Sequence, residues 1–485
     1  MAGIAEYWQN YIGDEFVDGG AGRIDVLDPG SGDVLCQHAL ADKADVDGAV
    51  ASARACVESG ALVDMRPIER GRLVQAMGHW LTEHTEEIAQ VLCREQGKPL
   101  WEARGEVAGA VRYFEYYGNQ ASTVEGRSIP LGAGYFDFTH LEPYGISAQI
   151  IPWNFPLEVA ARSIAAGLAT GNACVVKTSE MTPCSSRYFA LAAQAVGLPK
   201  GALQVFTGLG TEAGAALAAH PDINQVVFTG SVRTGQAIAA AAAQTVVPCV
   251  LELGGKSAAI VHEDADLAAF ESDVRRGIFV NAGQICSALS RVVAHESVHD
   301  ELVDRIAGVA KGLSVGPGIE RDAFGANMGP MVSAAQRDRA VDMVSTAQTE
   351  GARVVTGGHK LNAPGFFMEP TVLADVTPDM TIAQDEVFGP VVSVLKFRDE
   401  VEAIRIANGT QYGLVAGVFT RDLDRATRAA RSLRAGQIFV NEWFAGGVET
   451  PFGGYGKSGY GREKGREALM NYVQTKNVAI KLKDQ

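Results

Sequence analysis

Between residues 145 and 262 the chain alternates short β-branched runs with longer helical patterns, and this alternation limits the possible folds more than any other feature. Strands are predicted at 145–151, 173–177, 202–206, 223–228 and 248–253. Helices are predicted between them at 156–171, 185–197, 211–220 and 231–244. Repeated strand–helix units form a parallel sheet that is covered by helices on both faces.

A second alternating block runs from about 257 to 441. Its clearest segments are helices near 298–313 and 333–351 and strands near 415–420 and 437–441. We therefore predict an α/β fold with two Rossmann-like parallel-sheet domains.

Two other segments, 122–143 and 471–482, look like strands without helical partners. A lone strand exposes unpaired backbone groups, so we expect these segments to form a sheet edge or a small β arm between subunits.

Charge and cysteine content exclude several classes of protein. Lys and Arg number 42 against 57 for Asp and Glu, a net charge of −15, so neither nucleic acid nor an anionic membrane is an expected partner. The seven cysteines contain no CxxC pair, so we predict neither a disulfide framework nor a metal cluster. No secretion signal is recognisable and no apolar run reaches the roughly 20 residues that span a bilayer, so a cytoplasmic location is expected.

One cysteine has unusual neighbours. Cys286 lies in 281-NAGQICSALSR-291, where Gly283, Ser287 and Ala288 leave room for a ligand carbonyl to approach the sulfur. Other short motifs occur around it in a fixed order: 95-EQGKP-99, 152-PWNFP-156, 228-FTGS-231, 252-ELGGK-256, 386-EVFGP-390, 451-PFGG-454 and 459-GYGREKG-465. With these motifs the sequence resembles the aldehyde dehydrogenase superfamily over nearly its whole length.

The resemblance implies three catalytic residues. Cys286 would be the nucleophile that adds to an aldehyde carbonyl. Asn154 would stabilise the oxyanion together with the backbone N–H of Cys286. Glu252, at the carboxyl end of a predicted strand, would activate the water that hydrolyses the thioester. Family branches that pass the acyl group to coenzyme A generally lack this glutamate, so release of a free acid is favoured over the acylating alternative.

The resemblance also implies a dinucleotide. Gly230 and Ser231 open a helix whose N-terminus suits a pyrophosphate. Lys177 and Glu180 match the family's contacts to the adenosine ribose, and the carboxylate would repel a 2′-phosphate, which favours NAD over NADP, although dual use stays open. The remaining positions carried over for the cofactor are Ile151, Trp153, Gly210, Leu253, Glu386 and Phe388.

The sequence does not specify which aldehyde is the substrate. The segment 442–450 corresponds to the family's variable substrate loop, in which Trp443, Phe444 and Glu449 are candidates for the entrance. Arg162 resembles an arginine that holds a substrate carboxylate in some relatives, but Glu158, one helical turn earlier, is an alternative partner.

The resemblance implies a cofactor domain at 1–121 and 144–254, a catalytic domain at 255–456, and an arm at 122–143 and 466–485. Such arms would join copies into a homodimer or homotetramer. A non-catalytic structural protein on the same fold is the competing hypothesis, and the retained cysteine and glutamate argue against it.

Overall fold

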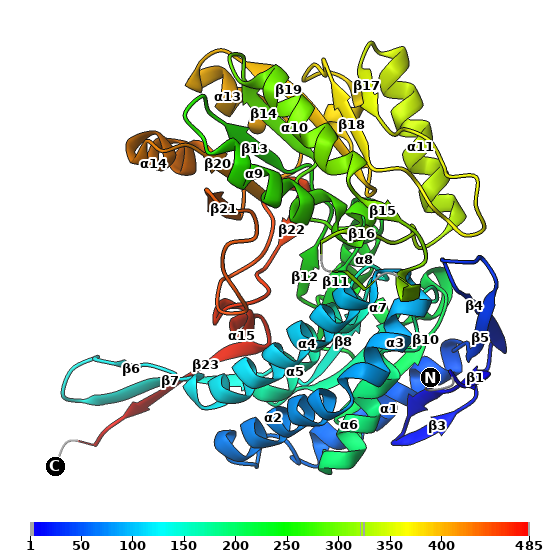
Figure 1. Cartoon of the computed structure of the whole chain (residues 1–485). Coiled ribbons are helices and arrows are strands. Elements are labelled where there is room, and N and C mark those ends of the chain that lie inside the picture. Colours follow the sequence, from blue (N-terminus) through cyan, green and yellow to red (C-terminus); the bar gives the residue numbers. More distant parts are fainter. Residues whose placement is uncertain (1–3, 321, 324, 484–485) are drawn as a thin grey trace.

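The computed structural model describes residues 4–320, 322–323 and 325–483. Two large sheets lie one above the other, with a thin β arm projecting from the lower part (Figure 1). The predicted fold class is confirmed. No helix in the described part of the chain combines the length and the apolarity that crossing a bilayer requires.

The lower sheet has eight strands. Their spatial order is β22 (Gly459–Tyr460), β12 (Cys249–Glu252), β11 (Gln225–Thr229), β8 (Ile146–Ile150), β9 (Ala173–Thr178), β10 (Leu203–Thr207), β2 (Asn10–Ile12) and β3 (Glu15–Val17). The five strands from β12 to β10 run parallel, and antiparallel strands close both edges. All five predicted strands are present within two residues of their expected bounds.

Helices cover both faces of this sheet because its strands are apolar on both sides. In β9, Cys174 and Val176 pack into one core while Ala173 and Val175 pack into the other. The first core includes side chains of α2 (Pro67–Glu83), α3 (Thr85–Gln96), α4 (Leu100–Gln120), α5 (Pro156–Thr170) and α6 (Arg187–Val196). The second includes side chains of α1 (Lys43–Glu58), α7 (Ala215–Ala218) and α8 (Val232–Thr245).

The prediction of one continuous helix at 211–220 is wrong. The chain forms a π-helical turn at Gly210–Gly214 and only one α-helical turn at Ala215–Ala218. Two glycines in five residues lower the helix propensity of this segment.

The upper sheet has seven strands. Their order is β17 (Arg353–Thr356), β18 (Thr371–Ala374), β19 (Val391–Phe397), β14 (Arg291–His295), β13 (Ala258–Val261), β20 (Val415–Phe419) and β21 (Gln437–Val440). All pairs are parallel except β17 with β18. The helices in this part are α9 (Leu267–Val274), α10 (His299–Lys311), α11 (Ala334–Thr349), α12 (Thr381–Gln384), α13 (Glu400–Ala407) and α14 (Leu423–Ser432).

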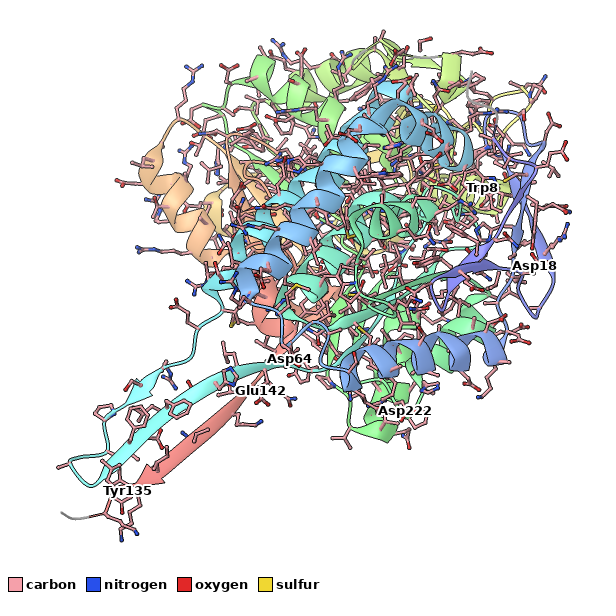
Figure 2. The ribbon with its side chains drawn as sticks, turned by 90° about the horizontal axis from the view of Figure 1, so that it is seen from below. Trp8, Asp18, Asp64, Tyr135, Glu142 and Asp222 are labelled. Carbon is pink, nitrogen blue, oxygen red and sulfur yellow. The ribbon has the colours of Figure 1, made fainter. Side chains whose placement is uncertain are left out.

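The two segments predicted without helical partners pair with each other. β23 (Val473–Lys481) runs antiparallel to β7 (Tyr135–Pro143), which also pairs with β6 (Ser128–Ile129). This ribbon leaves the body of the molecule near Glu142 and reaches out to Tyr135 (Figure 2).

The remaining elements are short. A small sheet near the N-terminus orders β1 (Tyr7–Trp8), β5 (Val34–Ala39) and β4 (Arg23–Leu27). β15 (Ser314–Val315) pairs with β16 (Asn327–Met328), and α15 (Glu467–Asn471) precedes the arm.

Candidate active site

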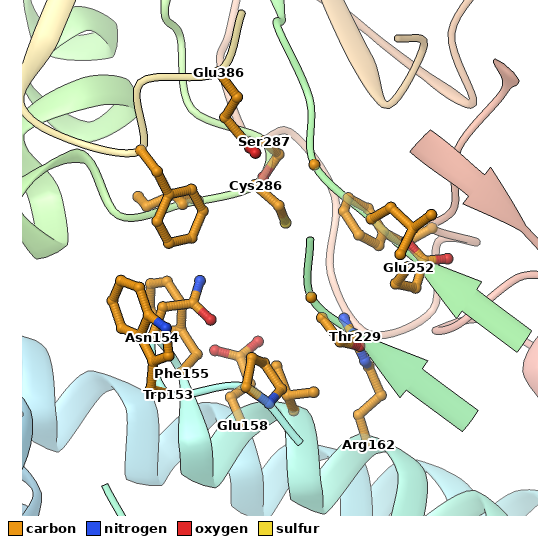
Figure 3. Close-up of a pocket in the computed structure, with 18 of the residues that line it drawn as sticks. Trp153, Asn154, Phe155, Glu158, Arg162, Thr229, Glu252, Cys286, Ser287 and Glu386 are labelled. Atoms are coloured by element: carbon orange, nitrogen blue, oxygen red, sulfur yellow. The ribbon is translucent and has the colours of Figure 1, made fainter. Parts of the chain in front are cut away.

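A cavity of about 960 Å³ lies at the carboxyl ends of the parallel strands in the lower sheet. Parallel α/β sheets bind ligands at this end, where the loops after the strands converge. Residues from the ends of β11 and β12, from α5 and from the loop containing Cys286 line it together (Figure 3). Cys286, Glu252 and Asn154, the three predicted catalytic residues, all face this cavity.

A left-handed turn aims Cys286 into the cavity. Asn281, Ala282 and Gly283 have φ values of 51°, 51° and 71°. A side chain at Gly283 would place its Cβ 2.1 Å from the carbonyl oxygen of Gly389, so only glycine fits there. Two non-glycine residues in this conformation cost on the order of 1–2 kcal/mol each, a strain that folded proteins keep mainly at functional sites.

Burial dominates the chemistry of the Cys286 thiol. It raises the pKa of the thiol to about 12, an effect that the guanidinium of Arg162 partly offsets. The thiol is therefore protonated at neutral pH, so it needs a base before it can attack a carbonyl. Its backbone N–H donates to no partner among the described residues and is free to bind a ligand oxygen.

Buried polar contacts fix Asn154 from two sides. The backbone carbonyl of Asn154 accepts hydrogen bonds from Lys98 Nζ (3.0 Å) and from Asn281 Nδ2 (2.8 Å). One amide N–H of Asn154 donates to the carbonyl of Gln284 at 2.9 Å, which leaves the second N–H for the cavity. Lys98 itself forms a buried ion pair with Glu106.

Glu106 also holds the start of α5. Its Oε1 accepts hydrogen bonds from the backbone N–H groups of Leu157 (2.9 Å) and Glu158 (3.2 Å), at the N-terminus of this helix. Sequence analysis included Lys98 in a motif but assigned it no role, and it did not identify Glu106. Apart from their ion pair with each other, their partners Asn154, Leu157 and Glu158 lie 51 to 56 residues further along the chain, beyond any local pattern.

Glu252 ends β12 with its side chain 2% exposed. Both carboxyl oxygens lack a hydrogen-bond partner within the described part of the protein. Burial, followed by the nearby carboxylate of Glu463, raises the pKa of Glu252 well above its usual range. A carboxyl group of raised pKa in the same cavity as a thiol is suited to proton transfer near neutral pH.

Arg162 does not pair with Glu158, the alternative partner that the helical spacing suggested. Arg162 forms an ion pair with Glu463, a residue that sequence analysis did not single out, and donates to Thr229 Oγ1 at 3.4 Å. Glu158 instead accepts a hydrogen bond from the Tyr113 hydroxyl at 3.3 Å. Burial alone would lower the pKa of Arg162, but Glu463, together with Tyr113, Glu252 and Cys286, raises the pKa above its usual value, so the guanidinium stays charged.

Glycines in 252-ELGGK-256 let two loops meet beside the cavity. A Cβ at Gly254 would lie 2.2 Å from Glu386 Oε2, and one at Gly255 would lie 2.5 Å from the carbonyl oxygen of Cys286. The backbone N–H of Gly255 donates to Glu386 Oε1 at 3.0 Å. Burial raises the pKa of Glu386 to about 7, and this hydrogen bond partly opposes the shift.

Several residues predicted to bind a cofactor line the same cavity: Trp153, Gly230, Ser231, Leu253, Glu386 and Phe388. Ser231 caps α8, accepting from the backbone N–H of Thr234 at 3.2 Å, so the N-terminus of this helix opens beside the cavity. The ring of Phe388, a residue with φ of +58°, meets the ring of Trp153 edge-on at 5.3 Å.

The other four residues predicted to bind the cofactor lie outside this cavity, near the ends of neighbouring strands. They are Ile151, Lys177, Glu180 and Gly210. Lys177, in β9, forms an ion pair with Glu180 at 3.3 Å. The backbone N–H of Ile151, just after β8, donates to the carbonyl of Lys177 at 3.0 Å. Gly210 opens the π-helical turn after β10.

Two of the three predicted entrance residues do not line the cavity. Trp443 is fully buried in the core of the upper sheet, where its indole N–H donates to the carbonyl of Ser287 at 3.2 Å. Glu449 is exposed and lies outside the lining. Phe444 does line the cavity, with Ala445 and Gly446 beside it. Within the described residues, no three His, Cys, Asp or Glu side chains are placed to hold a metal ion.

Comparison with known proteins gives one consistent result. Residues 16–478 match the model of the aldehyde dehydrogenase family. An aldehyde dehydrogenase of Emericella nidulans is 40% identical over 476 residues, covering 98% of this chain and 95% of the relative. A mitochondrial benzaldehyde dehydrogenase of Antirrhinum majus is 40% identical over 484 residues, covering 99% and 90%. The NAD⁺ complex of an aldehyde dehydrogenase from Bacillus cereus superimposes with a TM-score of 0.97 at 39% identity, covering 99% of this chain and 98% of that one.

Proposed function

Because the chain belongs to the aldehyde dehydrogenase family, we propose that it oxidises an aldehyde to the carboxylic acid with NAD, through a covalent adduct on Cys286. One observation carries the proposal: the thiol of Cys286, the carboxyl group of Glu252 and the amide of Asn154 meet in a single cavity. An aldehyde carbon releases hydride readily only after a nucleophile has made it tetrahedral, so a thiol, a base and an oxyanion donor are the groups required.

In the first step the Cys286 sulfur attacks the aldehyde carbon and the thiol proton leaves. The raised pKa of Glu252 makes its carboxylate a suitable proton acceptor. The free amide N–H of Asn154 and the backbone N–H of Cys286 stabilise the oxyanion that forms. NAD, when bound, accepts the hydride that leaves this carbon, and a thioester on Cys286 results.

The residues of the chain fit this cofactor. The α8 N-terminus beside Gly230 offers backbone N–H groups to a pyrophosphate. Glu180 and Glu386 provide carboxylates for the hydroxyls of the two riboses, and Trp153 and Phe388 provide an aromatic corner. The choice of NAD over NADP rests on Glu180.

In the last step Glu252 activates a water that hydrolyses the thioester. The buried carboxyl oxygens without partners support this role, because a base must have a lone pair free to accept the water proton. Transfer of the acyl group to coenzyme A would not need such a base.

Two variants separate the two steps. Cys286→Ala should form no NADH, because a methyl group cannot replace the nucleophile. Glu252→Gln should form NADH slowly and accumulate the thioester, which intact-mass spectrometry detects as an acyl adduct. Near wild-type turnover by Cys286→Ala would refute the nucleophile. Wild-type turnover by Glu252→Gln, with no adduct, would refute the hydrolytic role of Glu252.

We further propose that copies of the chain assemble as a homodimer or homotetramer through the arm. Large apolar side chains, among them Tyr135, Phe136 and Ile480, are about half exposed on the ribbon. A projecting ribbon with exposed apolar side chains gains stability when a second chain covers it.

A further inference from the structure

Two cations reach the part of the cavity that lies between α5 and the loop at 442–450. Arg162 and Lys464 both line the cavity and sit near the ring of Phe452, with the guanidinium carbon 5.8 Å and the ammonium nitrogen 5.7 Å from its centroid. A positive charge beside a catalytic thiol can select the charge of the substrate.

Arg162 is already engaged. It forms its ion pair with Glu463 and a hydrogen bond with Thr229, so a substrate carboxylate would have to compete with a buried protein carboxylate. In Figure 3, Arg162 and Glu158 rise from the same helix, with Arg162 on the Thr229 side and Glu158 on the Asn154 side. Breaking a buried pair leaves an uncompensated charge, which disfavours Arg162 as the substrate ligand.

Lys464 differs because its ammonium has no hydrogen bond or ion pair among the described residues. Burial lowers its pKa, while the nearby carboxylate of Glu158 acts to keep it charged. Its backbone is in the left-handed region, with φ of +64°, a conformation that glycine would adopt at lower cost. A lysine kept in a strained position, with its charge directed to a cavity and unpaired, points to a ligand.

Glu158 does not neutralise Lys464 by direct contact, since no ion pair within 4.0 Å joins them. Its carboxylate is held against α4: Oε1 accepts from the Tyr113 hydroxyl at 3.3 Å, and Oε2 lies 3.2 Å from where a Cβ on Gly109 would be. Lys464 and Glu158 carry opposite charges in this part of the cavity, and of the two Lys464 is therefore the one free to bind a ligand.

We propose that Lys464 binds an anionic group on the aldehyde, so that the preferred substrates are aldehydes bearing a carboxylate at the far end of a short chain. This inference rests on the proposed oxidation of aldehydes. The carboxylate forms a charge-assisted hydrogen bond with the ammonium while the carbonyl carbon lies at Cys286. Glu158 opposes the binding of the anion and limits its strength.

The test compares succinic semialdehyde with butanal, which have the same chain length and differ in the terminal charge. In Lys464→Met, which keeps the length of the side chain, the ratio of KM for succinic semialdehyde to KM for butanal should rise about tenfold, the effect of losing one hydrogen bond to a charged group. Lys464→Arg should keep most of the wild-type ratio. Glu158→Gln should lower the ratio, because it removes a like charge.

Lys457→Met is the matched control, since Lys457 is an exposed lysine seven residues earlier that lies outside the cavity lining. An unchanged ratio in Lys464→Met, or the same change in Lys457→Met, would overturn the assignment of Lys464. A rise in the ratio in Arg162→Leu without a rise in Lys464→Met would assign the anion to Arg162 instead. Absence of NADH formation from every aldehyde in the wild type is a different result, because it would refute the proposed function itself.

Discussion

Glu180 governs the choice between the two nicotinamide cofactors in our proposal. Its ion pair with Lys177, at 3.3 Å, keeps this lysine next to the carboxylate. Glu180→Ser removes the repelling carboxylate and frees this lysine, so we expect the ratio of kcat/KM for NADP to that for NAD to rise at least about tenfold, as for one charge-assisted contact. Glu296→Ser, at an exposed position in the upper part of the molecule, should leave the ratio unchanged. A wild type that already prefers NADP would contradict the role of Glu180.

The family resemblance predicted Cys286, Asn154 and Glu252 together, each from its own motif, and all three line one cavity. Sequence reasoning failed where the decisive contact joins distant positions. For Arg162 the helical spacing suggested Glu158, yet the stronger partner is Glu463, 301 residues away. For the neighbouring Trp443 and Phe444, the sequence does not show which ring is buried in the core. In the structure Trp443 is buried there and Phe444 is exposed.

At the scale of elements, the turn before Cys286 makes a sharp prediction. Gly283→Ala should cost far more stability than Gly13→Ala, because both glycines are left-handed but only Gly283 has a carbonyl oxygen within 2.1 Å of the added Cβ. The conformational cost alone, which Gly13→Ala measures, is about 1–2 kcal/mol. Urea unfolding gives both values, and NADH formation should fall at least tenfold only in Gly283→Ala. Equal losses in the two variants would mean that the close packing against Gly389 is unimportant.

A buried carboxyl group on α4 holds the same turn and should make stability depend on pH. Glu102 Oε2 accepts from the backbone N–H of Asn281 at 2.7 Å, and burial raises the pKa of Glu102 from 4.5 to about 8. Between these values the folded state keeps the proton and the unfolded state loses it. Stability therefore falls as pH rises, by up to about 1.4 kcal/mol per pH unit.

Glu102→Gln keeps an acceptor for Asn281 but cannot ionise. Its free energy of unfolding, relative to wild type, should therefore increase between pH 5 and pH 8, as measured by urea denaturation at several pH values. Glu296 is exposed, so the free energy of unfolding of Glu296→Gln should change with pH as that of the wild type does. A difference between Glu102→Gln and wild type that stays constant over this range would disprove the linkage.

Most elements could be predicted from hydrophobic patterning, because strands such as β8 and β9 are buried on both faces and helices such as α5 consist mostly of small or apolar residues. The order of the strands in the sheets could not be predicted from the sequence. β22 joins the lower sheet from residue 459 onward, and only tertiary packing brings it next to β12.

At the scale of the whole molecule, the arm makes assembly testable. Phe136 and Ile480 are directly opposite each other on the ribbon and are 51% and 43% exposed. Replacing both with serine should leave the fold of one chain intact and remove the apolar surface that a second chain would cover. Light scattering should then report a single-chain mass for the double variant and a dimer or tetramer for the wild type.

The control for this experiment is Leu423→Ser, which removes an apolar side chain that is 78% exposed on α14, away from the arm. It should assemble like wild type. A wild-type protein that is already monomeric at micromolar concentration would contradict assembly through the arm.

The pairing of β7 with β23 also affects how the protein is made. Pro143 pairs with Val473, 330 residues later. At roughly 5–20 residues per second, a ribosome needs about 17–66 s to pass from one strand to the other. Throughout that time one edge of β7 has no partner within its own chain, while a finished chain nearby carries a matching β23. Two chains emerging from neighbouring ribosomes on one messenger RNA therefore meet the conditions for strand exchange, so expression level and translation speed should influence how much domain-swapped product forms.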